Sequence, residues 1–410
     1  MSSQSEITLV VGAGHAGAEL VLALRQNGYV GRLILIGEEA ELPYRRPPLS
    51  KAYLSGEVSR ESLQIRTAAG YEKIQVECWV GVQVVSIDRQ TRSVTLSDGR
   101  VQPYDKLVLA TGGRARRLAE PTAQKHNVHY VRTVEDIDRL KAMFASGQRL
   151  LVVGGGYIGL EAAAVGIKSG LSVTVLEAAP RVLARVAAPE ISAFYEQVHR
   201  SRGVDLRTGV AVLDYLGDER VEAVRLSDGS ELALDLIVVG IGILPNDELA
   251  REAELAIDNG ILVDEFACTS DPDILAIGDC ANHVNGFLGR SVRIESVPSA
   301  QEQARTAAAT ICGKRVPHAA VPWFWSDQFD LKLQMVGLSQ GYDRLVLRGD
   351  VGAESFCAFY LKDGVVLSAD AVNRPQDFLM AKRLVAERLR VSAETLADEN
   401  VSLKSLFSVA

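Results

Sequence analysis

Apolar runs and helical stretches alternate near the start of the chain. The apolar run Ile7 to Val11 leads into a glycine-rich turn and then into a stretch of helical periodicity. A second apolar run, 33–36, ends at Glu38, and a later one, 106–110, leads into Thr111-Gly112-Gly113. Apolar runs that alternate with helical segments indicate parallel strands joined by crossover helices.

The same order of elements occurs again after residue 149. The run 150–153 precedes a second glycine-rich turn and helical stretch, the run 172–176 ends at Glu177, and the run 236–239 leads into Gly240. Each copy also carries a Ser-Asp-Gly triplet between alternating apolar and polar residues, which is typical of a hairpin turn. The repeat predicts two Rossmann-type sheets, each with an inserted antiparallel hairpin.

From about residue 317 the pattern changes. The segments 323–347 and 355–369 alternate like antiparallel strands, and 376–390 has the periodicity of an amphipathic helix. We therefore expect an α/β protein with two Rossmann-like domains and a separate C-terminal α+β domain.

The first glycine-rich turn has the spacing of a dinucleotide-binding motif. Gly12 allows a tight turn, Gly14 lets the backbone approach a pyrophosphate, and Gly17 lets the helix pack against the strand. The helix N-terminus then presents its partial positive charge to the phosphates. Glu38 stands where a carboxylate accepts hydrogen bonds from ribose hydroxyls. A turn without a ligand is the alternative interpretation of the glycines, and Glu38 argues against it.

The second turn repeats this cradle with Gly154, Gly156 and Gly159, and Glu177 repeats the carboxylate. A carboxylate at this position favours a free 2′-hydroxyl over a 2′-phosphate, and hence NADH over NADPH. Two nearby arginines, at positions 181 and 185, weaken that preference. Two cradles predict two bound dinucleotides, and the residues alone leave open which cradle holds which.

Composition and charge narrow the function further. The 410 residues carry a net charge of −8, which argues against a general nucleic-acid-binding role. The five cysteines include no C-x-x-C pair, so neither a disulfide framework nor a metal site is expected. No apolar run is long enough to span a membrane, and the first residues lack the apolar core of a signal peptide. We expect a soluble, cytoplasmic protein.

Eight segments carry a resemblance to known proteins. They are 47–51, 110–113, 154–161, 240–246, 269–272, 278–280, 293–297 and Pro-Trp-Phe-Trp-Ser-Asp-Gln at 322–328. Together they resemble the flavoprotein ferredoxin reductases of bacterial monooxygenase and dioxygenase systems, of the putidaredoxin, palustrisredoxin and rhodocoxin reductase type. Apoptosis-inducing factor is a more distant relation. The resemblance covers nearly the whole chain, and the last segment is specific to the ferredoxin-reductase branch.

The resemblance implies a glutathione-reductase-like arrangement of domains. A discontinuous FAD-binding domain takes 1–113 and 243–318, an NAD-binding domain takes 114–242, and a C-terminal α+β domain, 319–410, covers the flavin. By position, the residues implied to bind FAD are Gly12, Gly14, Ala16, Gly17, Glu38, Arg46, Pro47, Lys51, Val84, Thr111, Gly112, Arg132, Gly278, Asp279, Val297 and Trp325. The residues expected to bind NAD are Gly154, Gly156, Tyr157, Ile158, Gly159, Glu177, Arg185 and Gly242.

The resemblance also implies three reacting groups, Lys51, Glu161 and Trp325. Lys51 and Glu161 look onto the flavin from opposite sides of the nicotinamide pocket and can pair, and the lysine stabilises negative charge that develops on the flavin. An ordinary interdomain salt bridge is the alternative interpretation. Trp323 and Trp325 share a strand face. Core packing is the alternative for both, and only Trp325 is implied to shield the flavin or to lie along the electron route.

A missing cysteine separates this chain from thiol-dependent relatives. Disulfide reductases and peroxidases of the same fold place a redox cysteine near the flavin, whereas the matching stretch, 43–56, has no cysteine and contains Lys51. Thiol chemistry therefore lacks its nucleophile, and electrons must leave FAD directly for an external acceptor. Cys280 is expected to be a small buried thiol.

The implied reaction moves a hydride from NADH to FAD and then single electrons to an acidic 2Fe-2S ferredoxin, which supplies a haem-thiolate cytochrome monooxygenase. Arg66, Arg305, Lys332 and Lys404 are the basic residues expected to contact the ferredoxin, with solvated surface charge as the alternative. Gln334 stands where a relative carries a lysine, so partner specificity is expected to differ.

Other functions stay open on the sequence alone. They are the reductase component of an aromatic-ring dioxygenase or rubredoxin system, a disulfide reductase or peroxidase, and a flavoprotein like apoptosis-inducing factor. No nucleic acid or membrane is expected as a partner, and a monomer is expected.

Overall fold

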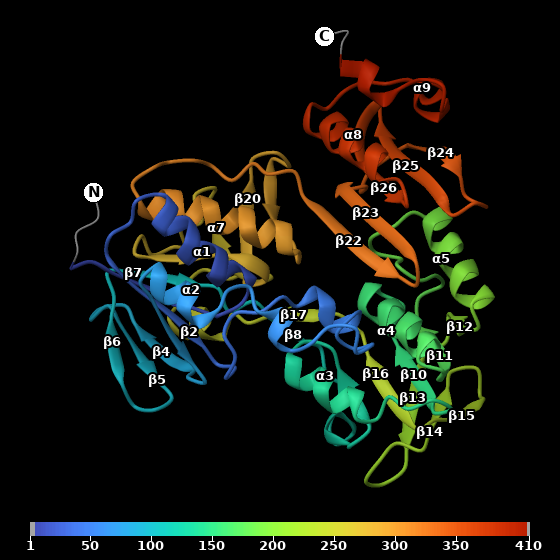
Figure 1. Ribbon diagram of the computed structural model, residues 1–410, viewed down its shortest axis with the longest axis horizontal. Helices are drawn as coiled ribbons and strands as arrows, with labels where there is room; N and C mark the ends of the chain where they lie inside the picture. Colours follow the sequence, from blue (N-terminus) through green and yellow to red (C-terminus); the bar gives the residue numbers. More distant parts are fainter. Residues whose placement is uncertain (1–4, 408–410) are drawn as a thin grey trace. The chain divides into compact units, whose positions relative to one another are not determined.

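The computed structural model describes residues 5–407 (Figure 1). These residues form two compact units. The first contains the chain up to Arg45, Glu61–Arg114 and Leu244–Trp323, and the second contains Arg46–Arg60, Ala115–Ile243 and the chain from Phe324 onward. The three-domain division, with boundaries after 113, 242 and 318, stays a prediction.

The first unit is built around a parallel five-stranded sheet with the order β19-β7-β1-β2-β3. These strands are β1 (Ile7–Val11), β2 (Arg32–Gly37), β3 (Val76–Val80), β7 (Lys106–Leu109) and β19 (Ile274–Ala276). Side chains from both of its faces are buried, Val10 and Leu33 in one cluster, Leu9 and Ile34 in another. Burial on both faces explains why the strands read as continuous apolar runs.

Helices cover one face of this sheet and β-structure covers the other. Helices α1 (His15–Gln26) and α7 (Val297–Ile311) lie side by side and share the cluster of Val10 (Figure 1). The opposite cluster includes residues of two three-stranded sheets. These sheets consist of β4 (Val84–Asp88), β5 (Ser93–Leu96) and β6 (Val101–Pro103), and of β18 (Ile261–Val263), β20 (Ala281–Asn285) and β21 (Arg290–Val292). The shorter helices of the unit are η2 (Glu61–Leu63), α2 (Ala68–Lys73), α6 (Glu248–Glu252) and η4 (Gly278–Cys280).

The second unit contains a parallel sheet of the same plan, with the order β12-β11-β10-β16-β9. Its strands are β9 (Val128–Tyr130), β10 (Arg149–Val153), β11 (Ser172–Glu177), β12 (Asp205–Thr208) and β16 (Leu236–Val239), and its helices are α3 (Val134–Lys141), α4 (Tyr157–Lys168) and α5 (Pro189–Ser201). An antiparallel sheet of β13 (Val212–Leu216), β14 (Ala223–Leu226) and β15 (Glu231–Ala233) covers one face. The predicted internal repeat, including the inserted hairpins, is therefore present.

The C-terminal part of the second unit is an antiparallel sheet with the order β22-β23-β26-β25-β24. Its strands are β22 (Trp323–Gln328), β23 (Leu331–Gly337), β24 (Arg344–Asp350), β25 (Ser355–Lys362) and β26 (Val365–Val372). Helices α8 (Pro375–Ala386) and α9 (Ala393–Ala397) and the turn η5 (Leu403–Phe407) follow. The helix predicted over 376–390 ends earlier, at Ala386, because Arg388 adopts a positive φ of 49° that a helix does not allow.

Four short elements complete the fold. They are η1 (Pro47–Ser50), η3 (Thr122–Gln124) and the strands β8 (Gly113–Ala115) and β17 (Ile243–Pro245). The two strands lie where the chain passes from one unit to the other. Within 5–407, no helix is both long and apolar enough to cross a bilayer.

Candidate active site

The first glycine cradle lies between β1 and α1. Gly12 has a φ of +116°, and a Cβ added there would lie 2.1 Å from the carbonyl oxygen of Ala110. A Cβ on Gly17 would lie 2.2 Å from the carbonyl oxygen of Gly12. A Cβ on Gly14, the residue that caps α1, would meet no atom within 4 Å. The outer glycines thus permit close backbone packing, while the middle one borders open space.

The second cradle, between β10 and α4, has the same geometry. Gly154 has a φ of +108°, with the carbonyl oxygen of Gly240 at 2.4 Å from an added Cβ, and Gly159 would meet the carbonyl oxygen of Gly154 at 2.1 Å. Gly156 would meet only one atom within 4 Å, at 3.9 Å. Neither α1 nor α4 has an acidic residue in its first turn. Both helix N-termini therefore keep their partial positive charge available to an anion such as a pyrophosphate.

The two acidic strand ends differ in their surroundings. Glu38 follows β2 and is exposed. Glu177 ends β11, and its oxygens accept hydrogen bonds from the backbone N–H groups of Gly155 and Ala179, both at 2.7 Å. This carboxylate is thus fixed against its own glycine turn, at the position expected to select the ribose.

The two arginines that follow Glu177 have different roles in the structure. Arg181 donates to the carbonyl oxygens of Ala184 and Ala187 and to Oγ of Ser192, so it holds its own loop together. Arg185 is exposed, and its guanidinium lies near Gly242, 3.8 Å from a Cβ added there. Of the two arginines, Arg185 is thus the exposed one, whereas Arg181 is engaged within its own loop.

Most residues expected to bind FAD belong to the first unit. They are Gly12, Gly14, Ala16, Gly17, Glu38, Val84, Thr111, Gly112, Gly278, Asp279 and Val297. Gly278 approaches Ala16 of α1, with 3.1 Å between the Cβ of Ala16 and a Cβ added to Gly278. Its N–H donates to Oε1 of Gln303 at 2.8 Å, which ties η4 to α7. These contacts bring the cradle, Gly278-Asp279 and the helix that begins at Val297 into one region.

Two other predicted FAD residues serve the structure of the first unit. Val84 is 2% exposed and packs in the core, so a ligand would meet its backbone rather than its side chain. Thr111 donates through Oγ1 to the carbonyl oxygen of Asn246 at 2.6 Å.

The remaining predicted FAD residues, Arg46, Pro47, Lys51, Arg132 and Trp325, belong to the second unit, as do all eight predicted NAD residues. Arg46 donates to the carbonyl oxygen of Arg132 at 2.7 Å. Among the predicted NAD residues, Tyr157 packs its ring on Phe324, with 5.1 Å between centroids, and Ile158 is 40% exposed at the start of α4.

The structure brings Lys51 and Glu161 together. Nζ of Lys51 lies 2.8 Å from Oε2 of Glu161, whose side chain is 1% exposed against 18% for the lysine. The same oxygen accepts from Oγ of Ser50 at 2.5 Å, and Oε1 accepts from Oγ of Ser326 at 2.6 Å. A buried carboxylate is costly unless it is paired and hydrogen-bonded. One ammonium and two hydroxyl groups meet that requirement here.

Local structure explains the position of the pair. Pro47 and Pro48 begin the 3-10 turn η1, which buries Leu49 and Ser50 and is followed directly by Lys51. This turn packs against α4, where Glu161 lies one turn past the helix start and faces inward. Prolines in the first turn preset the backbone φ, so the sequence favours this turn locally.

Trp325 lies on the other face of β22 from the serine that contacts Glu161. The strand alternates, so Trp323 and Trp325 share one face, as predicted, and Phe324, Ser326 and Gln328 share the opposite one. Trp325 is half-buried, whereas Ser326 and Gln328 are fully buried. The structure of the second unit thus joins Lys51 to Glu161 without bringing Trp325 into the same group.

The four predicted partner residues are accessible to different degrees. Lys332 and Lys404 are exposed, and Arg66 is half-buried. Arg305 is exposed, but it pairs with Glu19 at 3.0 Å and with Glu302 at 2.6 Å. Arg66 and Arg305 belong to the first unit and the two lysines to the second.

The cysteines offer no alternative chemistry. All five are free thiols, and Cys280 is fully buried with its pKa raised by burial. A buried thiol with a raised pKa is a poor nucleophile.

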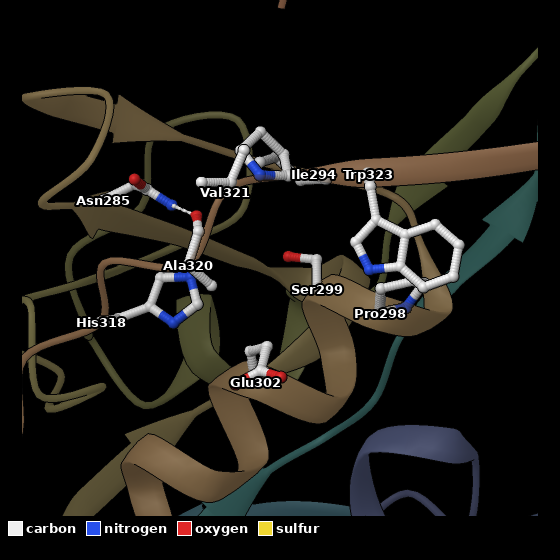
Figure 2. A pocket seen from close by; sticks show the side chains of 10 residues that line it. Asn285, Ile294, Pro298, Ser299, Glu302, His318, Ala320, Val321 and Trp323 are labelled. Atoms are coloured by element: carbon white, nitrogen blue, oxygen red, sulfur yellow. Dashed lines mark hydrogen bonds between the residues drawn. The ribbon is translucent and has the colours of Figure 1, made fainter. Parts of the chain in front are cut away.

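A small pocket beside α7 was missed by the sequence analysis (Figure 2). Ser299 and Glu302 of α7 face it, with His318 and Trp323 on its walls (Figure 2). The rings of His318 and His283 pack edge to face, with 4.5 Å between their centroids. Burial lowers the pKa of His318 to about 4 and the pKa of His283 to about 3. The pocket therefore presents a carboxylate and a neutral imidazole, and its lining contains no cation, so it does not suit an anionic dinucleotide.

Comparisons with known proteins agree with this geometry. Residues 7–304 match the family described as pyridine nucleotide-disulphide oxidoreductase, and residues 323–407 match the family described as reductase C-terminal. The chain is 47% identical to putidaredoxin reductase CamA of Pseudomonas putida over 98% of this chain and 97% of that protein. It is 45% identical to the 5,5′-dehydrodivanillate O-demethylase ferredoxin reductase subunit of Sphingobium sp., over 97% of both chains.

A solved structure extends the likeness to three dimensions. The structure of a covalent putidaredoxin reductase–putidaredoxin complex matches with a TM-score of 0.96 and 46% identity, over 100% of this chain and 99% of that one. The predicted fold class, two Rossmann-like dinucleotide-binding domains with a C-terminal α+β domain, is confirmed.

Proposed function

The chain belongs to the pyridine nucleotide-disulphide oxidoreductase family, and we propose that it passes electrons from NADH to a 2Fe-2S ferredoxin that supplies a cytochrome monooxygenase with a haem-thiolate centre. It is a flavoprotein ferredoxin reductase that uses FAD and NAD(P)H, as the sequence predicted. The open cradles at Gly14 and Gly156 support two bound dinucleotides.

The Lys51–Glu161 ion pair is the observation that carries the proposed site. FAD, when bound, accepts a hydride and releases electrons singly. The chain contributes a lysine whose charge is fixed by a buried carboxylate, and that carboxylate stands on the helix of the second cradle. We place this ammonium where negative charge develops during hydride transfer, because a preoriented cation in a partly dry site stabilises such charge strongly.

Trp325 is proposed to shield the flavin or to lie along the electron route. Its partial exposure supports this role, because Trp325 is half-buried on the face of β22 opposite to Ser326 and Gln328 and so keeps part of its ring accessible. The basic residues proposed to meet the ferredoxin are Arg66, Arg305, Lys332 and Lys404, and Lys332 shares a strand face with Gln334.

The nicotinamide specificity is proposed to favour NADH. Glu177 is held by two backbone N–H groups at the position expected to meet the ribose, and its negative charge opposes a 2′-phosphate. The exposed Arg185 is the group that would admit some NADPH.

Stopped-flow spectroscopy tests the proposal. NADH added to the purified flavoprotein under anaerobic conditions should bleach the flavin, and a 2Fe-2S ferredoxin such as putidaredoxin should then be reduced by one electron. Without bleaching by NADH the proposal fails. Rapid turnover of glutathione disulfide or peroxide would instead favour a thiol-dependent enzyme, which the cysteine-free segment 43–56 argues against. The cytoplasmic location and the monomeric state stay predictions.

A further inference from the structure

A chain of hydrogen bonds continues from Glu161 into the interior of the second unit. Ser326, which donates to Glu161, also contacts Nε2 of Gln328 at 3.2 Å. Oε1 of Gln328 lies 2.9 Å from Nε2 of His199 on α5. Ser326, Gln328 and His199 are each 0% exposed, so these contacts are shielded from bulk solvent. The chain links α4, β22 and α5 through side chains alone.

The donors and acceptors of these side chains allow the series of hydrogen bonds to run in only one direction. An ionised carboxylate accepts and cannot donate, so the hydroxyl of Ser326 must give its proton to Glu161. The oxygen of Ser326 must then accept from the amide nitrogen of Gln328, which only donates. The amide oxygen of Gln328 is left facing His199, so Nε2 of His199 must carry a proton. Every donor in the chain therefore points toward Glu161.

The protonation state of the His199 ring agrees with this direction of the hydrogen bonds. Burial lowers the pKa of His199 to about 4, so the ring is neutral at pH 7 and carries one proton. Its Nδ1 is buried without a hydrogen-bond partner among the described residues, and the ring packs on Phe329 with 5.0 Å between centroids. A lone pair at Nδ1 is less costly to leave unpaired than an N–H group, which again places the proton on Nε2.

We propose that Ser326, Gln328 and His199 are positioning residues that hold the Glu161 carboxylate in the rotamer that pairs with Lys51. The proposal rests on the proposed role of Lys51 and Glu161 at the flavin. Ser326 donates to the carboxylate oxygen that Lys51 does not contact, and Gln328 and His199 keep the Ser326 hydroxyl pointing at that oxygen. Aligned dipoles in a low-dielectric interior reinforce one another.

The tautomer of His199 is the direct test. Protein labelled with 15N-histidine contains six histidines, and comparison with a His199→Gln variant assigns the His199 ring signals. We expect the Nε2–H tautomer in the parent protein. Ser326→Ala and Glu161→Gln, which do not touch His199, should both shift its ring nitrogen signals, because each removes the group that fixes the direction of the chain.

Stopped-flow reduction by NADH and the flavin midpoint potential provide the functional test. Ser326→Ala should slow flavin reduction by about tenfold, the value of one hydrogen bond to a charged group, and should lower the midpoint potential. His199→Phe should act in the same direction, whereas Ser326→Thr and His199→Gln, which retain a donor, should restore most of the rate.

His129→Phe is the matched control. His129 is also a buried histidine of the second unit, and burial lowers its pKa to about 4. Its ring contacts Met143 and takes no part in the hydrogen bonds that lead to Glu161. This variant should leave the flavin reduction rate and the potential unchanged.

The outcomes separate this inference from the proposed function. If NADH does not bleach the parent flavoprotein, the proposed function fails, and the His199 signals alone decide whether the directed chain exists. The proposed series of hydrogen bonds is refuted if the parent flavin is reduced but His199 carries its proton on Nδ1. It is also refuted if the ring nitrogen signals of His199 do not shift in Ser326→Ala. If the His129 and His199 variants lose the flavin reduction rate equally, Ser326, Gln328 and His199 act only as ordinary core residues.

Discussion

Nζ of Lys51 lies 2.8 Å from Oε2 of Glu161, although the two residues are 110 positions apart in the chain. The lysine directly follows a 3-10 turn, and the glutamate lies on the helix of the second glycine cradle. The carboxylate is almost completely buried, so its charge depends on this ammonium and on two hydroxyl groups.

Replacing Lys51 should therefore affect both stability and rate. Lys51→Met leaves a buried carboxylate without its cation and should lower the free energy of unfolding by about 2 kcal/mol. Flavin reduction by NADH should slow by about 100-fold, as when a preoriented charge-stabilising group is lost. Denaturant unfolding and stopped-flow spectroscopy measure the two effects.

The double variant Lys51→Met with Glu161→Gln separates these effects. Removing the charge from residue 161 should recover much of the lost stability, because no unpaired ion remains buried. The rate should stay low, since the ammonium is still missing. Recovery of the rate together with stability would contradict a role for Lys51 at the flavin.

The glycine cradles give paired substitutions with opposite expectations. Gly156 borders open space, so Gly156→Ala should change the free energy of unfolding by less than about 1 kcal/mol. The same substitution should raise the KM for NADH. Gly159→Ala forces a Cβ to within 2.1 Å of a backbone oxygen and should cost about 2 kcal/mol or more. Thermal unfolding and steady-state kinetics with an artificial electron acceptor distinguish the two variants. In the first cradle, Gly14→Ala should lower the FAD content with little loss of stability, whereas Gly17→Ala should destabilise the fold.

The parts of the molecule that were predictable from sequence are those set by local rules. The two cradles, the strand ends at Glu38 and Glu177, and the hairpins depend on the spacing of glycine, acidic and apolar residues within one βαβ unit. The hydrogen bonds that Ser50 and Ser326 donate to Glu161 could not be predicted, because the two serines come from distant segments and serine carries no strong signal. The link from Ser326 through Gln328 to His199 was hidden for the same reason. Sequence alternation in β22 places Ser326 and Gln328 on one face, but it does not reveal what that face meets.

Nicotinamide selectivity should respond to Glu177 and Arg185 in opposite directions. Glu177→Gln keeps an oxygen for one of the two backbone N–H groups but removes the charge that repels a 2′-phosphate. The ratio of kcat/KM for NADPH to that for NADH should rise by about tenfold. Arg185→Ala should lower the same ratio, whereas a rise in this variant would show that Arg185 does not admit NADPH.

The charges of the predicted partner residues should not contribute equally to ferredoxin binding. Lys332→Glu and Lys404→Glu reverse exposed charges and should each weaken binding of an acidic 2Fe-2S ferredoxin, with the effect shrinking at high salt. Arg305→Ala should have a smaller effect, because Glu19 and Glu302 already offset that charge. Titrations of ferredoxin reduction at several ionic strengths test this order, and a dominant effect of Arg305 would contradict it.

Asp370 should make stability fall as the pH rises from about 4 to about 7. Its side chain is 3% exposed on β26, accepts a hydrogen bond from the Tyr360 hydroxyl, and has its pKa raised by burial to about 7. Below the unfolded-state pKa of about 4 the carboxyl is protonated in both states, so nothing is lost. Above that pH the unfolded state releases the proton first, and folding loses a few kcal/mol until the folded pKa is reached.

Asp370→Asn isolates this contribution, because the amide remains uncharged at every pH and still offers an oxygen to Tyr360. The variant should be more stable than the parent at pH 7.5 and nearly equal to it at pH 4. Other carboxylates titrate over the same range in both proteins, so the difference in free energy of unfolding between them is the quantity to measure. A difference that does not change between pH 4 and pH 7.5 would mean that Asp370 does not hold its proton in the folded protein.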